Sequence, residues 1–176
     1  VSQTGGGTLN ITGGITGAGT GIKTVRFNNT GMVNIITTGI SDGPTGSVIV
    51  EQSGVGTTTF GTANTYTGGT IVSAGTLAVN GSSLAASGRL TISGGIVNLS
   101  GAEMVKSLFF GAVPQAAGVY SATGVGGTIA SANFSGDGTL IVTSGPGQND
   151  PYTTWIDSAI YNTPPLSAAD KLPGAD

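Results

Sequence analysis

The chain contains neither cysteine nor histidine. Without cysteine there are no disulfide frameworks, thiol nucleophiles or Cys-ligated zinc sites. Without histidine the commonest general base is also missing, which leaves Ser or Thr activated by Lys as the remaining nucleophile chemistry. Neither Lys23 nor Lys106 stands in a Ser-x-x-Lys context. We therefore expect no catalytic residue, no metal site and no cofactor.

Charged residues are scarce, at 7% of the chain, and the net charge is -3. Residues 1–144 are neutral, because they carry equal numbers of bases and acids: Lys23, Arg26, Arg89 and Lys106 against Asp42, Glu51, Glu103 and Asp137. No basic stripe neutralises a row of phosphates, so nucleic-acid binding is disfavoured. The longest apolar runs are far below the roughly 20 residues of a membrane helix, so we expect no membrane span.

Glycine is abundant, with 33 residues, and it is accompanied by many Thr, Ser, Val and Ile residues. Gly favours tight turns, whereas Thr, Val and Ile favour pleated strands. The glycines have no three-residue period, which excludes collagen. Branched apolar residues recur in short runs, which disfavours disorder. The composition predicts an all-β protein of short strands and many turns.

A short unit recurs, reading Gly, variable, Leu, variable, Ile or Val. It stands at 7–11, 75–79, 88–92 and 138–142. The alternation places both apolar side chains on one face of a strand, with Gly supplying the turn before it. Further short strands are expected at 23–28, 32–36, 47–51, 57–60, 70–73 and 96–99.

Strands this short bury an apolar face when successive coils stack on one another. We therefore predict a parallel β-solenoid over residues 1–144, with a β-sandwich as the alternative fold. Composition changes after Ser144. Residues 145–151 have the turn residues of a linker, and 153–161 have the apolar spacing of one short amphipathic helix within the tail 145–176.

The run Asn64-Thr65-Tyr66-Thr67-Gly68-Gly69-Thr70, followed by Ala74-Gly75-Thr76-Leu77, resembles the autotransporter-associated β-strand repeat, also called the passenger-associated transport repeat. The resemblance covers a repeat core of about 59–95. Residues 105–143 resemble the segment that closes such arrays in large exported proteins of planctomycetes and verrucomicrobia. The resemblance implies a right-handed parallel β-helix, secretion or display on a bacterial cell surface, and no catalytic activity.

The tail resembles the linker that leads, in those proteins, to an Asp-rich calcium-binding stretch and a sorting signal. That stretch is absent from the sequence, so we expect no calcium site there. Gly136-Asp137-Gly138 occurs once, and a calcium-binding repeat needs the motif in tandem. A turn is the interpretation that we adopt.

Parallel β-helices also carry polysaccharide lyases and hydrolases, whose chemistry needs paired carboxylates roughly 5 to 10 Å apart. Asp42 and Asp137 lie in Gly-containing turns, where Asp commonly caps local backbone. Glu51, at a strand end, and Glu103, in a loop or short helical turn, are interpreted as solvated edge charges. The asparagines Asn64, Asn80 and Asn98 are expected to stack in ladders along the solenoid.

The two ends of a solenoid expose apolar surface and unpaired backbone, so they must be capped, extended or docked to another copy. The candidate cap or assembly contacts are Leu108, Phe109, Phe110 and Tyr120 in the body, with Tyr152, Trp155, Ile156 and Ile160 in the tail. We predict a non-catalytic extracellular passenger module that acts as a rigid spacer or display stalk. The alternative is a homo-oligomeric filament subunit joined end to end or by tail exchange. A carbohydrate-active or carbohydrate-binding β-helix, with a surface polysaccharide as its partner, is the third hypothesis.

Overall fold

A computed structural model describes residues 1–35 and 38–146. In this part of the chain the structure is all-β, with strands and a single 3-10 turn, η1 (Val125–Gly127), and without any α-helix. Each expected strand is found as a strand, and the expected strand at 57–60 has the same bounds as β8 (Thr57–Phe60). The predicted linker and helix at 145–176 lie almost wholly outside the described residues.

Two larger sheets form most of the fold. The first has the strand order β1 (Ser2–Gln3), β4 (Thr20–Asn29), β7 (Thr45–Gln52), β9 (Thr70–Val72), β11 (Arg89–Ile92), β14 (Ser107–Phe110) and β15 (Val113–Pro114). The second has the order β18 (Phe134–Gly136), β12 (Ile96–Ser100), β10 (Thr76–Asn80), β8, β5 (Met32–Ile35) and β2 (Thr8–Ile11).

Two smaller sheets complete the described part of the chain. One contains β13 (Ala102–Val105), β19 (Thr139–Val142), β16 (Gly118–Ser121) and β17 (Ile129–Ala130), and the other contains β3 (Ile15–Thr16) and β6 (Ile40–Ser41).

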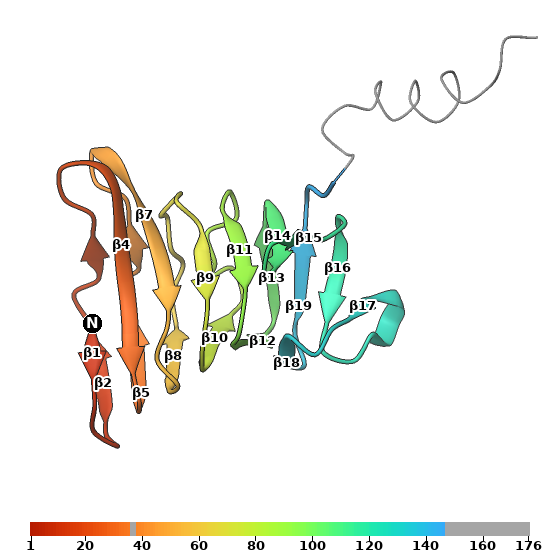
Figure 1. Cartoon of the computed structure of the whole chain (residues 1–176), viewed down its shortest axis with the longest axis horizontal. Helices are drawn as coiled ribbons and strands as arrows, with labels where there is room; N and C mark the ends of the chain where they lie inside the picture. Colours follow the sequence, from red (N-terminus) through yellow and green to blue (C-terminus); the bar gives the residue numbers. More distant parts are fainter. Residues whose placement is uncertain (36–37, 147–176) are drawn as a thin grey trace, which may run out of the picture.

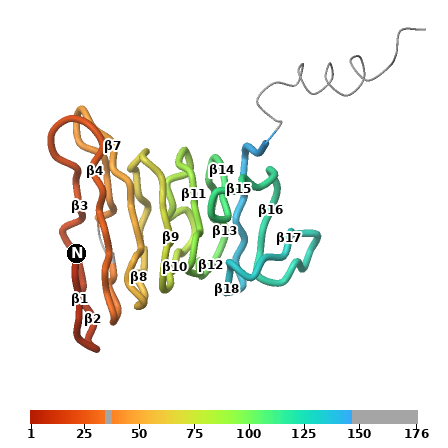
Figure 2. The backbone as a smooth tube through the Cα atoms, in the orientation of Figure 1, coloured from red at the N-terminus to blue at the C-terminus, as the bar shows by residue number. Residues whose placement is uncertain are grey.

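Successive passages of the chain add one strand to each large sheet. In the second sheet Thr8 pairs with Met32, Met32 with Thr57, Thr57 with Thr76 and Thr76 with Ile96, so the separations are 24, 25, 19 and 20 residues. All these pairs are parallel, and the passages lie side by side from the N-terminus onward (Figures 1 and 2). Parallel pairing at such regular intervals is consistent with a β-helix and differs from the antiparallel pairing of a sandwich.

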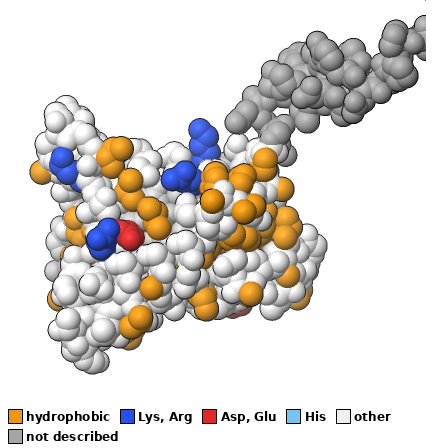
Figure 3. All heavy atoms as spheres, viewed as in Figure 1, with side chains coloured by type: hydrophobic (Ala, Val, Ile, Leu, Met, Phe, Trp, Pro, Cys, Tyr) orange, Lys and Arg blue, Asp and Glu red, His pale blue; other side chains and the backbone are white. Residues whose placement is uncertain are grey.

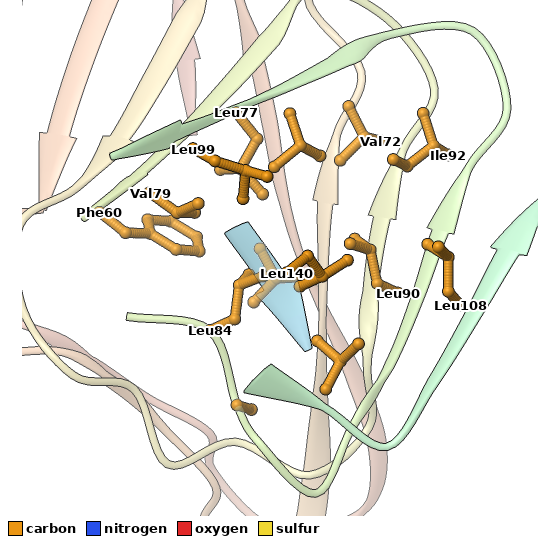
Figure 4. Packing of buried hydrophobic residues seen from close by; sticks show 14 of the residues in the cluster. Phe60, Val72, Leu77, Val79, Leu84, Leu90, Ile92, Leu99, Leu108 and Leu140 are labelled. Atoms are coloured by element: carbon orange, nitrogen blue, oxygen red, sulfur yellow. The ribbon is translucent and has the colours of Figure 1, made fainter. Parts of the chain in front are cut away.

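The core lies where alternate side chains of the sheets face inward. One buried row crosses the second sheet in register through Val33, Thr58, Leu77, Val97 and Phe134. Figure 4 shows Leu77 and Leu99 of this sheet packed with Val72, Leu90 and Ile92 of the first sheet. The period-2 pattern of the sequence therefore places mostly apolar side chains inside the stack from β5 to β18.

Glycine is required where one coil passes close to the next. Gly75 has a φ of 60°, and a Cβ there would collide with the carbonyl oxygens of Gly54 and Gly56 on the preceding coil. Both the left-handed backbone and the contact exclude a larger residue.

The pairing changes at the C-terminal end of the stack. β14 pairs with β15 and β16 with β19, both in antiparallel fashion, and the partner of Val97 on the next coil is Phe134, 37 residues later. The parallel pairing that the sequence predicts therefore holds for most of the stack, whereas this end also contains antiparallel pairs. A tight turn at Gly111, with a φ of 60°, brings β15 back beside β14, which a parallel connection of this length could not do.

Candidate functional site

A row of amide side chains lies at the turns of one corner of the N-terminal coils; Asn29 and Gln52 are buried and Gln3 is partly exposed. Gln3, Asn29 and Gln52 each donate a side-chain N–H to the carbonyl oxygen two residues further on, at 2.5, 2.7 and 2.7 Å. Gln52 Nε2 also donates to Asn29 Oδ1 at 3.1 Å, and the hydroxyl of Thr58 donates to Gln52 Oε1 at 2.6 Å. The bond between Gln52 and Asn29 joins adjacent coils, and the bonds to carbonyl oxygens provide partners for Gly5, Gly31 and Gly54 in the turns.

A second polar row crosses four coils on another side of the stack. Ile40 N donates to Asn64 Oδ1 at 2.6 Å, and Asn64 Nδ2 donates to the carbonyl oxygen of Ser83. Ser83 N and Ser83 Oγ donate to Glu103 Oε1 at 3.1 and 2.9 Å, and Leu84 N donates to Glu103 Oε2 at 2.9 Å. Polar side chains of three successive coils, Asn64, Ser83 and Glu103, therefore form a row that also binds the backbone of Ile40.

Glu103 corrects the sequence interpretation, because it is neither a loop residue nor solvated. It lies in β13 with 1% of its surface exposed, on the same inward face as Val105. The three hydrogen bonds from Ser83 and Leu84 compensate for the loss of hydration of the carboxylate. The alternation of Glu103 with Val105 in the sequence could have indicated that the Glu103 side chain points inward. Its hydrogen-bond donors could not be found in the same way, because they lie about one coil earlier in the chain.

Asp42 caps backbone, as predicted, and also joins two coils. Asp42 Oδ1 accepts from Val48 N at 2.6 Å and Thr67 N at 3.2 Å, and Oδ2 accepts from Thr67 Oγ1 at 2.6 Å. Burial alone would raise the pKa of Asp42, but the hydrogen bonds from Thr67 and Val48 outweigh it and hold the pKa below its usual value of 3.8.

Glu51 is not an edge charge. It lies in β7, an interior strand of the first sheet, opposite Arg26 of β4. Arg26 Nε contacts Glu51 Oε2 at 2.7 Å, and Ser73 Oγ donates to Glu51 Oε1 at 3.4 Å. Asp137 lies exposed in the bend between β18 and β19, as the predicted turn requires.

The acidic side chains therefore occupy separate parts of the fold. Asp42 lies in a loop, Glu51 faces outward from the first sheet, Glu103 is buried and Asp137 is at a bend. Within residues 1–35 and 38–146, no three Asp or Glu side chains come together as a metal-binding group.

The predicted ladder of Asn64, Asn80 and Asn98 is wrong, because the register places these residues in different rows. Asn98 lies opposite Ala78 and Ser135, and its Nδ2 donates to Ser135 Oγ at 2.9 Å. An amide ladder forms instead at the N-terminal end, where Asn34 Nδ2 donates to Asn10 Oδ1 at 2.9 Å.

Three aromatic rings gather at the C-terminal end of the core. Phe110, Tyr120 and Phe134 have ring centroids 6.1 to 6.5 Å apart. Tyr120 also donates its hydroxyl to the carbonyl oxygen of Ala116 at 2.8 Å, and burial raises the pKa of Tyr120. Phe134 was not among the candidate cap residues, although it stands in the closing segment.

The other candidate contacts divide into two groups. Leu108 is fully buried, whereas Phe109 on the same strand faces outward beneath the guanidinium of Arg89, whose Cζ lies 5.2 Å from the ring centroid. Beside Phe109 is a cavity of about 300 Å³. The tail candidates Tyr152, Trp155, Ile156 and Ile160 lie outside the described residues.

The residues that carry the family resemblance have structural contacts. Asn64 belongs to the second polar row, and Thr67 binds Asp42 of the preceding coil. Tyr66 is fully buried and its hydroxyl lies 2.5 Å from Thr70 Oγ1; burial raises its pKa well above the usual value. A Cβ at Gly68 would lie 2.5 Å from the carbonyl oxygen of Val48. The motif thus joins one coil to its neighbours.

Among the described residues, no helix has the length and apolar character needed to cross a membrane. The family model of the passenger-associated transport repeat matches residues 50–79, which confirms the resemblance to this repeat over a short part of the chain. The match points to a structural role in an exported passenger domain. Comparison with curated proteins and with solved structures gives no match.

Proposed function

We propose that this chain is a non-catalytic segment of a right-handed parallel β-helix that acts as a rigid spacer or display stalk outside the cell. The single observation that carries the proposal is the continuity of its rows. Apolar and polar rows run in register from coil to coil, and no buried side-chain N or O atom in the described residues lacks a hydrogen-bond partner.

Such rows suit a spacer because every coil is bound to the next by the same kinds of contact. Strand hydrogen bonds run along the stack at a spacing of about 4.8 Å, so extension needs only further coils. The amide row and the Asn64–Glu103 row add side-chain hydrogen bonds to the backbone bonds that already join the coils at two corners. Because charged residues are only 7% of the chain, its surface offers few charged groups to bind a partner. The function of the module then depends on its length and shape.

Electron microscopy and mass measurement in solution test this proposal. We expect short rods with the mass of a single chain, and X-ray scattering should give an elongated particle. Globular particles would refute the spacer. A cleavage activity on polysaccharides that is lost on neutralising the exposed acids would refute the non-catalytic assignment.

A filament subunit is the second candidate, and the N-terminal end supports it. There β1, β2 and β3 form the edges of their sheets, and Leu9 of β2 is 38% exposed. The C-terminal end is closed by antiparallel strands and the aromatic cluster, which opposes head-to-tail stacking. Regular fibres would make the filament the primary function. A carbohydrate-active site has less support, because among the described acids Asp42, Glu51 and Asp137 lie on different elements and Glu103 is buried.

A further inference from the structure

A hollow lies beside β14, on the outside of the stack. It has a volume of about 300 Å³ and is lined by Lys106, Ser107, Leu108, Phe109, Pro114, Gln115, Ser144, Gly145 and Pro146. A cavity of this size is at the lower limit of ligand pockets, with room for a large side chain or a small molecule. Figure 3 shows basic side chains next to a group of hydrophobic side chains on this face.

The rim combines an aromatic ring with positive charge. Phe109 is half-buried and presents its ring outward, and Lys106 is exposed beside it. Arg89 stacks on Phe109 and adds a second cation. Two of the described acids have other partners: Glu103, on β13, is turned into the core, and Glu51 is paired with Arg26. This chemistry fits a ligand that carries an aromatic group and a carboxylate together.

The described part of the chain ends at this cavity. Ser144 N donates to the carbonyl oxygen of Lys106 at 2.8 Å, and Gly145 packs against the backbone of Ala116 and Ala117. Pro146, the last described residue, is part of the cavity wall. The residues that precede the tail are therefore held at the opening of the cavity.

The sequence of residues 147–176 has the complementary chemistry. It contains Asp150, Asp157, Asp170 and Asp176 against Lys171, so this tail carries a net charge of -3, which is the whole net charge of the protein. Trp155, the single tryptophan of the chain, stands two residues before Asp157. Trp155 follows Pro146 by nine positions, and such a segment spans at most about 30 Å when extended. A tether this short gives an effective concentration in roughly the millimolar range.

We infer that this cavity is the docking site of the chain's own tail, with Trp155 entering beside Phe109 and Asp157 facing Lys106 and Arg89. Large aromatic side chains are the residues that most often anchor such contacts. The docked tail would cover the outer face of β14 and β15 and shield the edge of the first sheet. The inference goes beyond the spacer function and does not depend on it.

Fluorescence of Trp155 in the full chain tests the inference, because no other tryptophan contributes. We expect blue-shifted emission and weak quenching by acrylamide in the native protein. Phe109→Ala and Lys106→Glu should each shift the emission to the red and raise the quenching constant toward that of a free tryptophan derivative. Lys106→Glu combined with Asp157→Lys should restore weak quenching, since the opposite charges face each other again.

The matched control is Lys23→Glu, which makes the same charge change on β4, at the other end of the first sheet. It should leave both signals unchanged. Far-UV circular dichroism checks that Phe109→Ala remains folded, and Lys106→Glu gives an independent result if it does not. Strong quenching in the native protein, or equal quenching in all variants, would overturn the inference. A signal that changes with protein concentration would also overturn it, because the tail would then dock on a second copy.

Discussion

Removing the Glu103 carboxylate is the sharpest test of how the coils are joined. In Glu103→Ala, three buried donors lose their acceptor: Ser83 N, Ser83 Oγ and Leu84 N. Each buried donor left without a partner costs about 1–3 kcal/mol, and the three costs do not add fully because two share one oxygen. We therefore expect Glu103→Ala to lower the free energy of unfolding by about 3–5 kcal/mol.

Two further variants separate hydrogen bonding from charge. Glu103→Gln keeps an oxygen acceptor for Ser83 but turns an NH₂ group toward Leu84 N, so it should cost about 1–3 kcal/mol, less than the alanine variant. Glu51→Ala removes a partly exposed glutamate paired with Arg26 and should cost at most about 1 kcal/mol.

Urea unfolding followed by far-UV circular dichroism at neutral pH measures all three variants. Glu103→Ala should lower the free energy of unfolding more than Glu103→Gln does, and Glu51→Ala should stay near the wild type. A Glu103→Ala protein as stable as the wild type would refute the polar row as a stabilising element. Equal losses for Glu103→Ala and Glu103→Gln would show that the negative charge, and not the hydrogen-bonding pattern, matters.

Three other changes give distinct expected outcomes. Hydrogen bonds hold the pKa of Asp42 below 3.8, so the stabilisation linked to its charge is present above pH 3.8 and is lost as the pH falls through the folded-state pKa. Urea midpoints should show Asp42→Ala destabilised at neutral pH, with a difference from the wild type that shrinks as the pH is lowered below 3.8. Gly75→Ala should cost more than about 1 kcal/mol in urea unfolding, since its φ is 60° and a Cβ would meet backbone oxygens, whereas Gly7→Ala, with open space around it, should cost far less. Phe134→Ala should lower stability by about 3–5 kcal/mol by emptying the aromatic cluster, and Val125→Ala, at 76% exposed, should leave the melting temperature nearly unchanged; a Phe134→Ala protein that melts with the wild type would argue against the cluster as a cap.

The sequence by itself determined the strands and turns of the described region. Alternating apolar residues and the glycines before them located β2, β10, β11 and β19, because side-chain direction in a strand and the preference of glycine for turns are local properties. The all-β class followed from the same local preferences. The repeat motif around Tyr66 was also readable, since its residues form one short contiguous run.

Tertiary structure alone decided which residues face one another across coils. The interval between paired residues changes from 24 and 25 to 19 and 20 along the second sheet, so Asn98 lies opposite Ala78 and not another asparagine. Likewise, Glu103 is buried because donors at Ser83 and Leu84 lie beside it on the preceding coil. Register and burial of polar groups depend on the summed length of intervening turns and on distant partners, and neither quantity is contained in a local pattern.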